Sequence, residues 1–181
     1  MARLTIDGYG QVELNNVAFR RDGRIEAQCA LSTADFSANT PAENGMILRV
    51  KKASHEVCFA DASAKNQLYA LNYSSEHMYD EREPGLKNFS LVPGEFYPRL
   101  GYLSVGDLWT TNCVDLGTYA SAGAVAAAMT NAEVYATVGT QGAPVFAATV
   151  PTSAVGPVMQ VIKKTTMPDG QEAFQLQVLS V

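Results

Sequence analysis

The stretch "VMQVIKKTTMPDGQEAFQLQVLSV", residues 158–181, decides the fold. Its segment from Met167 to Gly170 places a proline and an Asp-Gly pair between two flanks in which apolar and polar residues alternate. Proline presets the backbone of a tight turn, and glycine tolerates the positive φ that such turns need. Alternation with a period of two is typical of a strand with one buried face, so the stretch predicts a β-hairpin. The alternation places Phe174, Leu176 and Val178 on one face and Gln175, Gln177 and Leu179 on the other.

Short apolar runs separated by turn residues recur along the chain. They occur in "RLTIDGYGQVELNNVAF" (3–19) and in "NFSLVPGEFYPRLGYLSVGDLWTTNCVDLG" (88–117). Asp22-Gly23 predicts another hairpin turn. The alanine-rich "SAGAVAAAM" (121–129) predicts a short helix that begins near a capping serine. We therefore expect a mainly β protein, a compact β-barrel or sandwich-like domain with one short helix and an extended N-terminal arm.

The stretch "STADFSANTPAENG", residues 32–45, is polar and rich in turn-forming residues. Such composition between periodic segments is typical of a loop or linker. It predicts an arm or hairpin region over residues 1–35, a linker at about residues 36–45 and a β-rich domain over residues 46–181.

Charge and hydropathy exclude several function classes. The net charge is −5, and the longest basic clusters are Arg20-Arg21 with Arg24, Lys51-Lys52 and Lys163-Lys164. These clusters are too short to follow a phosphate backbone, so no nucleic-acid partner is expected. The N-terminus has no apolar core of a signal peptide, and no window approaches the ~20 apolar residues of a membrane span. We expect a soluble chain made in a cytoplasm, with no membrane partner.

The residue types that carry catalysis or bind metals are sparse. Cys113 has no histidine downstream of it, so it is interpreted as a packed strand residue rather than a nucleophile. The pair His55-x-x-Cys58 lacks the further ligands of a structural zinc site. The acidic run at residues 76–83 lacks the spacing of a calcium loop and is interpreted as a solvated loop. The sequence therefore predicts no enzyme, no catalytic residue, no metal and no cofactor.

Aromatic residues near turns suggest a surface for a protein partner, because aromatic side chains are enriched in such contacts. The alternative is that they cover the core of a small β-domain. Arg99 is the one cation in the aromatic cluster, where it can stack on a ring or anchor a partner. The candidate partner-binding residues are Leu4, Ile6, Tyr9, Val12 and Leu14 in the arm, and Phe96, Tyr97, Arg99, Tyr102 and Trp109 in the cluster.

The segments "LSVGDLWTTNCV", "VYATVGTQGAPVF" and "VIKKTTMPDGQEAFQLQVL" resemble auxiliary proteins of tailed-bacteriophage heads, the decoration or cement class. The resemblance covers residues 89–181, about half of the chain. It implies a non-enzymatic virion protein, commonly a homotrimer, that sits on the capsid exterior and binds the major capsid protein. In such proteins an N-terminal arm commonly lies along the capsid protein.

Two other functions remain open at this stage. One is a different virion role, as a head-fibre base, tail or head–tail joining protein. The other is a β-rich glycan-binding module, which would use an exposed Trp109 or tyrosine as a stacking platform.

Overall fold

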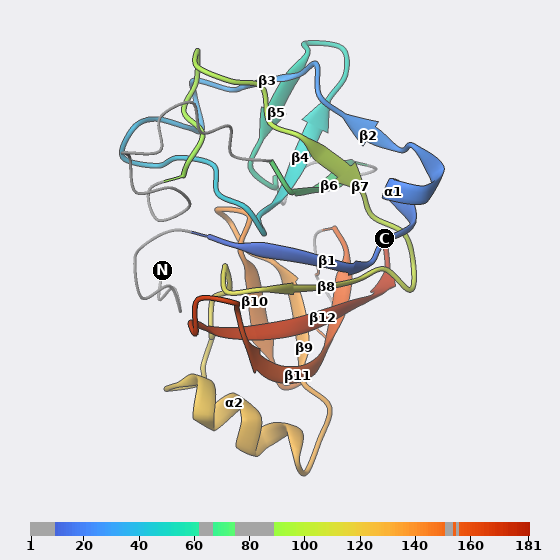
Figure 1. Ribbon diagram of the computed structural model, residues 1–181, viewed down its shortest axis with the longest axis vertical. Coiled ribbons are helices and arrows are strands. Elements are labelled where there is room, and N and C mark those ends of the chain that lie inside the picture. Colours follow the sequence, from blue (N-terminus) through green and yellow to red (C-terminus); the bar gives the residue numbers. More distant parts are fainter. Residues whose placement is uncertain (1–9, 62–66, 75–88, 151–153, 155) are drawn as a thin grey trace.

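The computed structural model describes residues 10–61, 67–74, 89–150, 154 and 156–181. These residues form two six-stranded sheets, which lie one above the other in Figure 1. The upper sheet has the order β2-β7-β6-β4-β5-β3 and the lower sheet the order β1-β8-β12-β11-β9-β10. Described neighbours pair antiparallel except β3 and β5, which are parallel. The protein is mainly β and sandwich-like, as the sequence predicts.

The strands are short, apart from the last two. Those of the upper sheet are β2 (Ile25–Glu26), β3 (Ala30–Leu31), β4 (Ile47–Lys51), β5 (Glu56–Cys58), β6 (Leu68–Asn72) and β7 (Leu100–Tyr102). Those of the lower sheet are β1 (Val12–Asn16), β8 (Leu108–Thr111), β9 (Tyr135–Val138), β10 (Pro144–Ala147), β11 (Val158–Thr166) and β12 (Glu172–Ser180). The helices are α1 (Ala18–Asp22) and α2 (Ala122–Met129).

The hairpin predicted at the C-terminal end is confirmed as β11 and β12. The Met167 N–H donates to the Gln171 carbonyl at 2.8 Å and the Gly170 N–H to the Met167 carbonyl at 2.9 Å, which closes the turn. Gly170 has φ +88°, a value that L side chains rarely adopt. Phe174, Leu176 and Val178 are buried, as their alternation predicts.

The lower sheet curls into a half-barrel. After β8 the chain turns back to meet β10, where Asp115 forms a bridge with Val145. The Asp115 N–H donates to the Pro144 carbonyl at 2.8 Å, and the Phe146 N–H donates to the Asp115 carbonyl at 3.0 Å. Gly117 follows with φ +61°, and a Cβ there would lie 2.1 Å from the Phe146 carbonyl oxygen. Glycine at this position lets the two segments approach closely.

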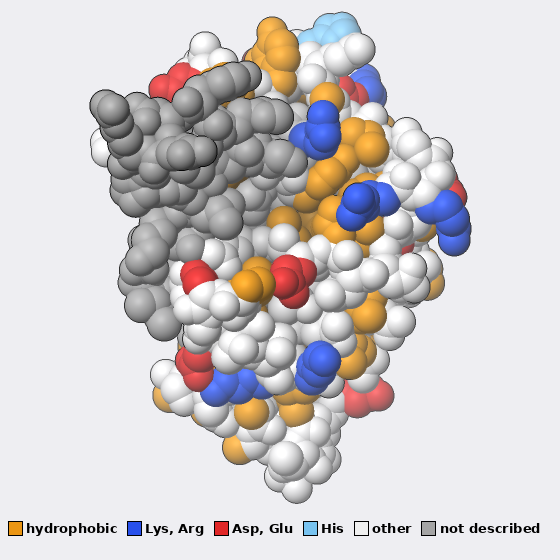
Figure 2. Space-filling view, viewed as in Figure 1, with side chains coloured by type: hydrophobic (Ala, Val, Ile, Leu, Met, Phe, Trp, Pro, Cys, Tyr) orange, Lys and Arg blue, Asp and Glu red, His pale blue; other side chains and the backbone are white. Residues whose placement is uncertain are grey.

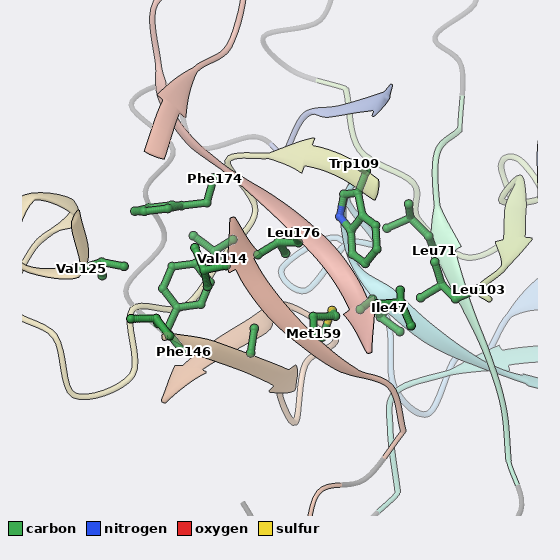
Figure 3. Packing of buried hydrophobic residues seen from close by; sticks show 14 of the residues in the cluster. Ile47, Leu71, Leu103, Trp109, Val114, Val125, Phe146, Met159, Phe174 and Leu176 are labelled. Atoms are coloured by element: carbon green, nitrogen blue, oxygen red, sulfur yellow. The ribbon is translucent and has the colours of Figure 1, made fainter. Parts of the chain in front are cut away.

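The larger core joins the two sheets (Figure 3). Trp109 of β8 is fully buried and points toward Leu71 and Ile47 of the upper sheet. Phe146 and Phe174 pack edge to face at the other end of this core, with ring centroids 4.9 Å apart. A second cluster, which includes Phe36, Met46 and Leu100, fills the upper sheet's other side.

Two helices are described rather than the one predicted. The helix predicted at residues 121–129 is α2, and the Ser121 hydroxyl accepts the Ala124 N–H at 3.1 Å as its N-cap. The additional helix is α1, where the sequence predicts a hairpin turn at Asp22-Gly23 instead. Gly23 ends α1 in the left-handed conformation, with φ 69°. Positive φ at glycine serves a helix C-terminus as well as a hairpin turn, so the Asp-Gly pair alone does not distinguish them.

The division into a separate arm, linker and domain is wrong for residues 10–45. β1 pairs along its length with β8, and Phe19 of α1 is fully buried in the larger core. Within the predicted linker, Phe36 and Ala42 are buried. The apolar residues of this turn-rich stretch pack into the core, so the stretch is not a flexible linker. Residues 1–9, the first part of the predicted arm, lie outside the described residues.

The place of Phe19 predicts a large loss of stability on truncation. We expect Phe19→Ala to lower the free energy of unfolding by about 3–5 kcal/mol, because it leaves a cavity between α1 and Gly101 of β7. Urea unfolding followed by tryptophan fluorescence measures the change. The control Arg21→Ala removes an exposed side chain of the same helix and should change stability by less than about 0.5 kcal/mol. Equal stability of both variants would show that α1 is not part of the core.

Candidate functional site

An open groove lies at the junction of the two sheets, beside the C-terminus. Its volume is about 620 Å³, in the range of sites that hold small molecules or side chains of a partner. Its walls come from the turn after α1, from β6 and β7, and from the residues that flank β11 and β12. In Figure 2, hydrophobic side chains gather over β7 on this face, and lysine and arginine side chains border them.

Three aliphatic side chains of this groove are open to solvent. Ile25 of β2 is 42% exposed, Leu68 of β6 is 51% exposed, and Val181 at the chain end is 70% exposed. A single exposed aliphatic residue is ordinary, but several that line one hollow mark a binding surface. The groove is therefore an apolar candidate site among the described residues.

Arg24 holds one end of the groove. Its Nη2 donates to the Tyr102 carbonyl at 3.0 Å and to the Leu103 carbonyl at 3.3 Å, and it also contacts the Ser104 hydroxyl. Its Nε and Nη1 meet no acceptor within the described part of the chain. A guanidinium carries five N–H donors in a fixed plane, so the side chain is positioned by one nitrogen and keeps N–H donors on the other two.

Lys52 also lines the groove and is held by a buried carboxylate. Its ammonium forms an ion pair with Glu26 and lies 5.8 Å from the centroid of the Tyr102 ring. Glu26 is buried, and its carboxylate also accepts the Gln28 N–H at 2.8 Å and the Tyr102 hydroxyl at 3.5 Å. A buried carboxylate needs such partners. Glu26 therefore fixes both the lysine and the tyrosine of the groove.

The tyrosines of the groove keep their protons more strongly than free tyrosine does. Burial raises the pKa of Tyr102 above its ordinary value of 10.0, and nearby Cys29 raises it further. Burial also raises the pKa of Tyr69, with an opposing contribution from Arg49. Both phenols therefore stay protonated to a higher pH than a free tyrosine does.

A second exposed surface is the loop before β7, which we call the aromatic loop (residues 92–99). Phe96 is 68% exposed and Tyr97 is 65% exposed, although both are large aromatic side chains. The loop is fixed at its end, because the Arg99 N–H donates to the Ser74 hydroxyl at 2.8 Å and the Arg99 carbonyl accepts the Tyr73 N–H at 3.0 Å. The Arg99 side chain is exposed. Exposed aromatics on an anchored loop are typical of a protein contact.

The predicted partner-binding residues separate into distinct places. Phe96, Tyr97 and Arg99 lie on the aromatic loop, and Tyr102 lines the groove. Val12 and Leu14 of β1 are partly buried against the larger core, and Leu4, Ile6 and Tyr9 lie outside the described residues.

The prediction that Trp109 contacts a partner is wrong. Trp109 is fully buried because β8 is an inner strand of the lower sheet and turns the indole toward the upper sheet. The glycan-binding hypothesis thereby loses its best stacking platform.

The other chemical candidates occupy unpromising settings. Cys113 is fully buried against the backbone of Gly10 and Gly45, where a Cβ on either glycine would lie within about 3 Å of it. Cys58 is buried, whereas His55 is exposed. The acidic run at residues 76–83 lies outside the described residues, as part of 75–88. Among the described residues no three His, Cys, Asp or Glu side chains cluster as metal ligands would.

Sequence reasoning missed most of the groove. Arg24 and Lys52 had been noted only as members of short basic clusters, and Ile25 and Leu68 carried no signal. The available hint was that two basic clusters occur in an acidic chain and each adjoins a strand. Which strands lie side by side is a long-range property, so their convergence required the structure.

Comparisons with known proteins add no identification. No family model, no curated protein and no solved structure matches this chain. No helix in the described residues is long and apolar enough to cross a membrane. The fold and surface thus define a mainly β, two-sheet protein with an apolar groove and an exposed aromatic loop.

The raised pKa of Tyr102 predicts a loss of stability in alkali. In the unfolded chain Tyr102 ionises near pH 10.0, whereas in the folded chain it stays neutral to higher pH. Its contribution is therefore complete below about pH 10 and is lost as pH rises through the folded pKa. We expect Tyr102→Phe to reduce the fall in unfolding free energy between pH 8 and pH 11, measured with urea. An unchanged fall would exclude a role for this phenol.

Proposed function

We propose that this chain is a non-enzymatic virion protein that decorates the exterior of a bacteriophage capsid as a homotrimer. Its partner would be the major capsid protein, and its binding would stabilise the shell. The resemblance of residues 89–181 to decoration proteins supports this function. The observation that carries it furthest is the exposed pair Phe96 and Tyr97, which lies within that same half of the chain.

The aromatic loop has the physical properties of a contact anchor. Aromatic side chains bury a large area for few rotatable bonds, so they lose little entropy when a partner orders them. Phe96 and Tyr97 are neighbours, and hydrogen bonds at Arg99 fix the base of the loop. A loop anchored in this way needs less reorganisation on binding than a free segment.

Trimer formation suits a protein that covers a repeated lattice. Cyclic oligomers match the local symmetry axes of a shell. Three linked contacts raise the overall affinity because the second and third form at high effective concentration. A single modest contact per chain is then sufficient for stable decoration.

Truncating the aromatic pair tests this function. Cosedimentation of the purified chain with undecorated shells would measure occupancy, and we expect Phe96→Ala with Tyr97→Ala to weaken binding at least about 30-fold per subunit. The control Ile162→Ala with Leu179→Ala also removes two exposed apolar side chains, on β11 and β12, and should bind as wild type does. Undiminished decoration by the aromatic variant would overturn the loop's role.

Solution mass tests the oligomeric state and separates decoration from other virion roles. Light scattering behind a sizing column should give the mass of three 19.4 kDa chains. Six or twelve chains would favour a ring-forming head–tail joining protein instead. A monomer at all concentrations would contradict a preassembled trimer.

A further inference from the structure

The groove combines exposed aliphatic side chains with two cations, and this combination recognises an apolar group that carries a negative charge. Ile25 and Leu68 supply apolar surface, while Arg24 and Lys52 stand at the rim. We infer that the groove binds an extended peptide segment of the partner protein in which an apolar side chain adjoins an aspartate or glutamate. This inference rests on the proposed function, because it names a second contact with the capsid protein.

Two cations line the groove, although the whole chain is acidic. The chain carries −5, but Arg24 and Lys52 are among the residues that line the groove. Glu26 is buried and paired with Lys52, whereas the Arg24 guanidinium forms no ion pair among the described residues. The Arg24 guanidinium can therefore attract an acidic side chain of a segment that binds in the groove.

Both cations keep N–H groups that can donate to an anion. Arg24 is fixed through Nη2 alone, so the N–H groups of Nε and Nη1 can still donate to a carboxylate. Lys52 uses its ammonium on Glu26 but remains more than half exposed, with further N–H groups for a ligand. Because the positions of both are set in the free protein, binding loses little side-chain entropy.

The apolar surface continues beyond the groove, which favours an extended peptide over a compact molecule. Arg24 also contacts Ser104, and the next residue, Val105, is 66% exposed on the turn between β7 and β8. An exposed apolar side chain that does not line the groove therefore adjoins a residue that Arg24 contacts. A peptide with alternating apolar and acidic side chains is long enough to contact both the groove and this side chain. Two rim cations are too few to hold a nucleic-acid backbone.

A pair of synthetic peptides tests the recognition directly. The first is an acetylated and amidated hexapeptide of alternating leucine and aspartate, and the second replaces each aspartate with asparagine. Amide shifts in NMR spectra of the full chain report binding. We expect the aspartate peptide to shift Ile25, Leu68 and Tyr102 and to saturate, and the asparagine peptide to bind about tenfold more weakly.

Variants separate the charge from the apolar surface. Arg24→Gln with Lys52→Gln should remove the preference for the aspartate peptide, whereas the control Lys163→Gln, an exposed lysine on β11, should keep it. Leu68→Ser should weaken both peptides equally. Equal binding of the two peptides to the wild type, or shifts confined to other surfaces, would overturn the inference. Binding of dodecanoate but of neither peptide would reassign the groove to a small amphipathic anion. Self-association abolished by Leu68→Ser would reassign it to a second copy.

The shell assay distinguishes failure of this inference from failure of the proposed function. If shells are decorated equally by wild type and by the Arg24→Gln, Lys52→Gln variant, the function stands and the groove contact is wrong. If no shell is decorated but the aspartate peptide still binds with its preference, the recognition stands and the capsid partner is wrong. Reduced decoration by the groove variant, together with the peptide preference, supports both.

Discussion

The contact of the Trp109 indole with the upper sheet is the interaction on which the rest of the structure depends. β8 lies between β1 and β12, and it points Trp109 across to Ile47 and Leu71. The indole N–H has no hydrogen-bond partner among the described residues, a loss of about 1–3 kcal/mol. Full burial of so large an apolar surface exceeds that loss, because a buried tryptophan removes 150–250 Å² from water at about 25 cal/mol per Å². Neither sheet has a complete core without the other.

Joining two sheets through one core requires the chain to cross between them, and one carboxylate holds two of the crossings together. The first crossing is α1, between β1 and β2, and the second is the turn between β7 and β8. Asp107 is buried at this place and accepts the Ala18 N–H at 2.6 Å and the Ser104 N–H at 2.8 Å. The groove lies against these crossings, with Arg24 following the first and Leu103 preceding the second. Its shape is therefore a consequence of how the sheets are connected.

The features that could be predicted from the sequence are those specified by neighbouring residues. The β11–β12 hairpin follows from a turn whose three special residues are adjacent, and α2 follows from a capping serine before an alanine-rich run. The same local rules failed at Gly23, because a left-handed glycine ends a helix as readily as it forms a hairpin turn. They failed again for residues 36–45, because turn-rich composition does not show whether Phe36 faces solvent or core.

The same distinction between neighbouring residues and long-range packing applies to the candidate site. Phe96 and Tyr97 could be singled out from the sequence because they are adjacent in the chain, whereas the groove is built from segments between Gly23 and Val181 that only the sheet order brings together.

β7 places these two surfaces at a fixed separation. The aromatic loop ends where β7 begins, and Tyr102 at the other end of β7 lines the groove. Three strand residues span about 10 Å. β7 is paired on both sides, with β2 and β6, so this spacing does not change easily. A partner that contacts both surfaces meets an aromatic anchor and a groove lined by two cations at a fixed distance from each other. The conformational entropy lost on binding is then mainly that of the partner. The combination would select partners by the distance between an apolar site and an acidic segment, a stricter criterion than either surface applies alone.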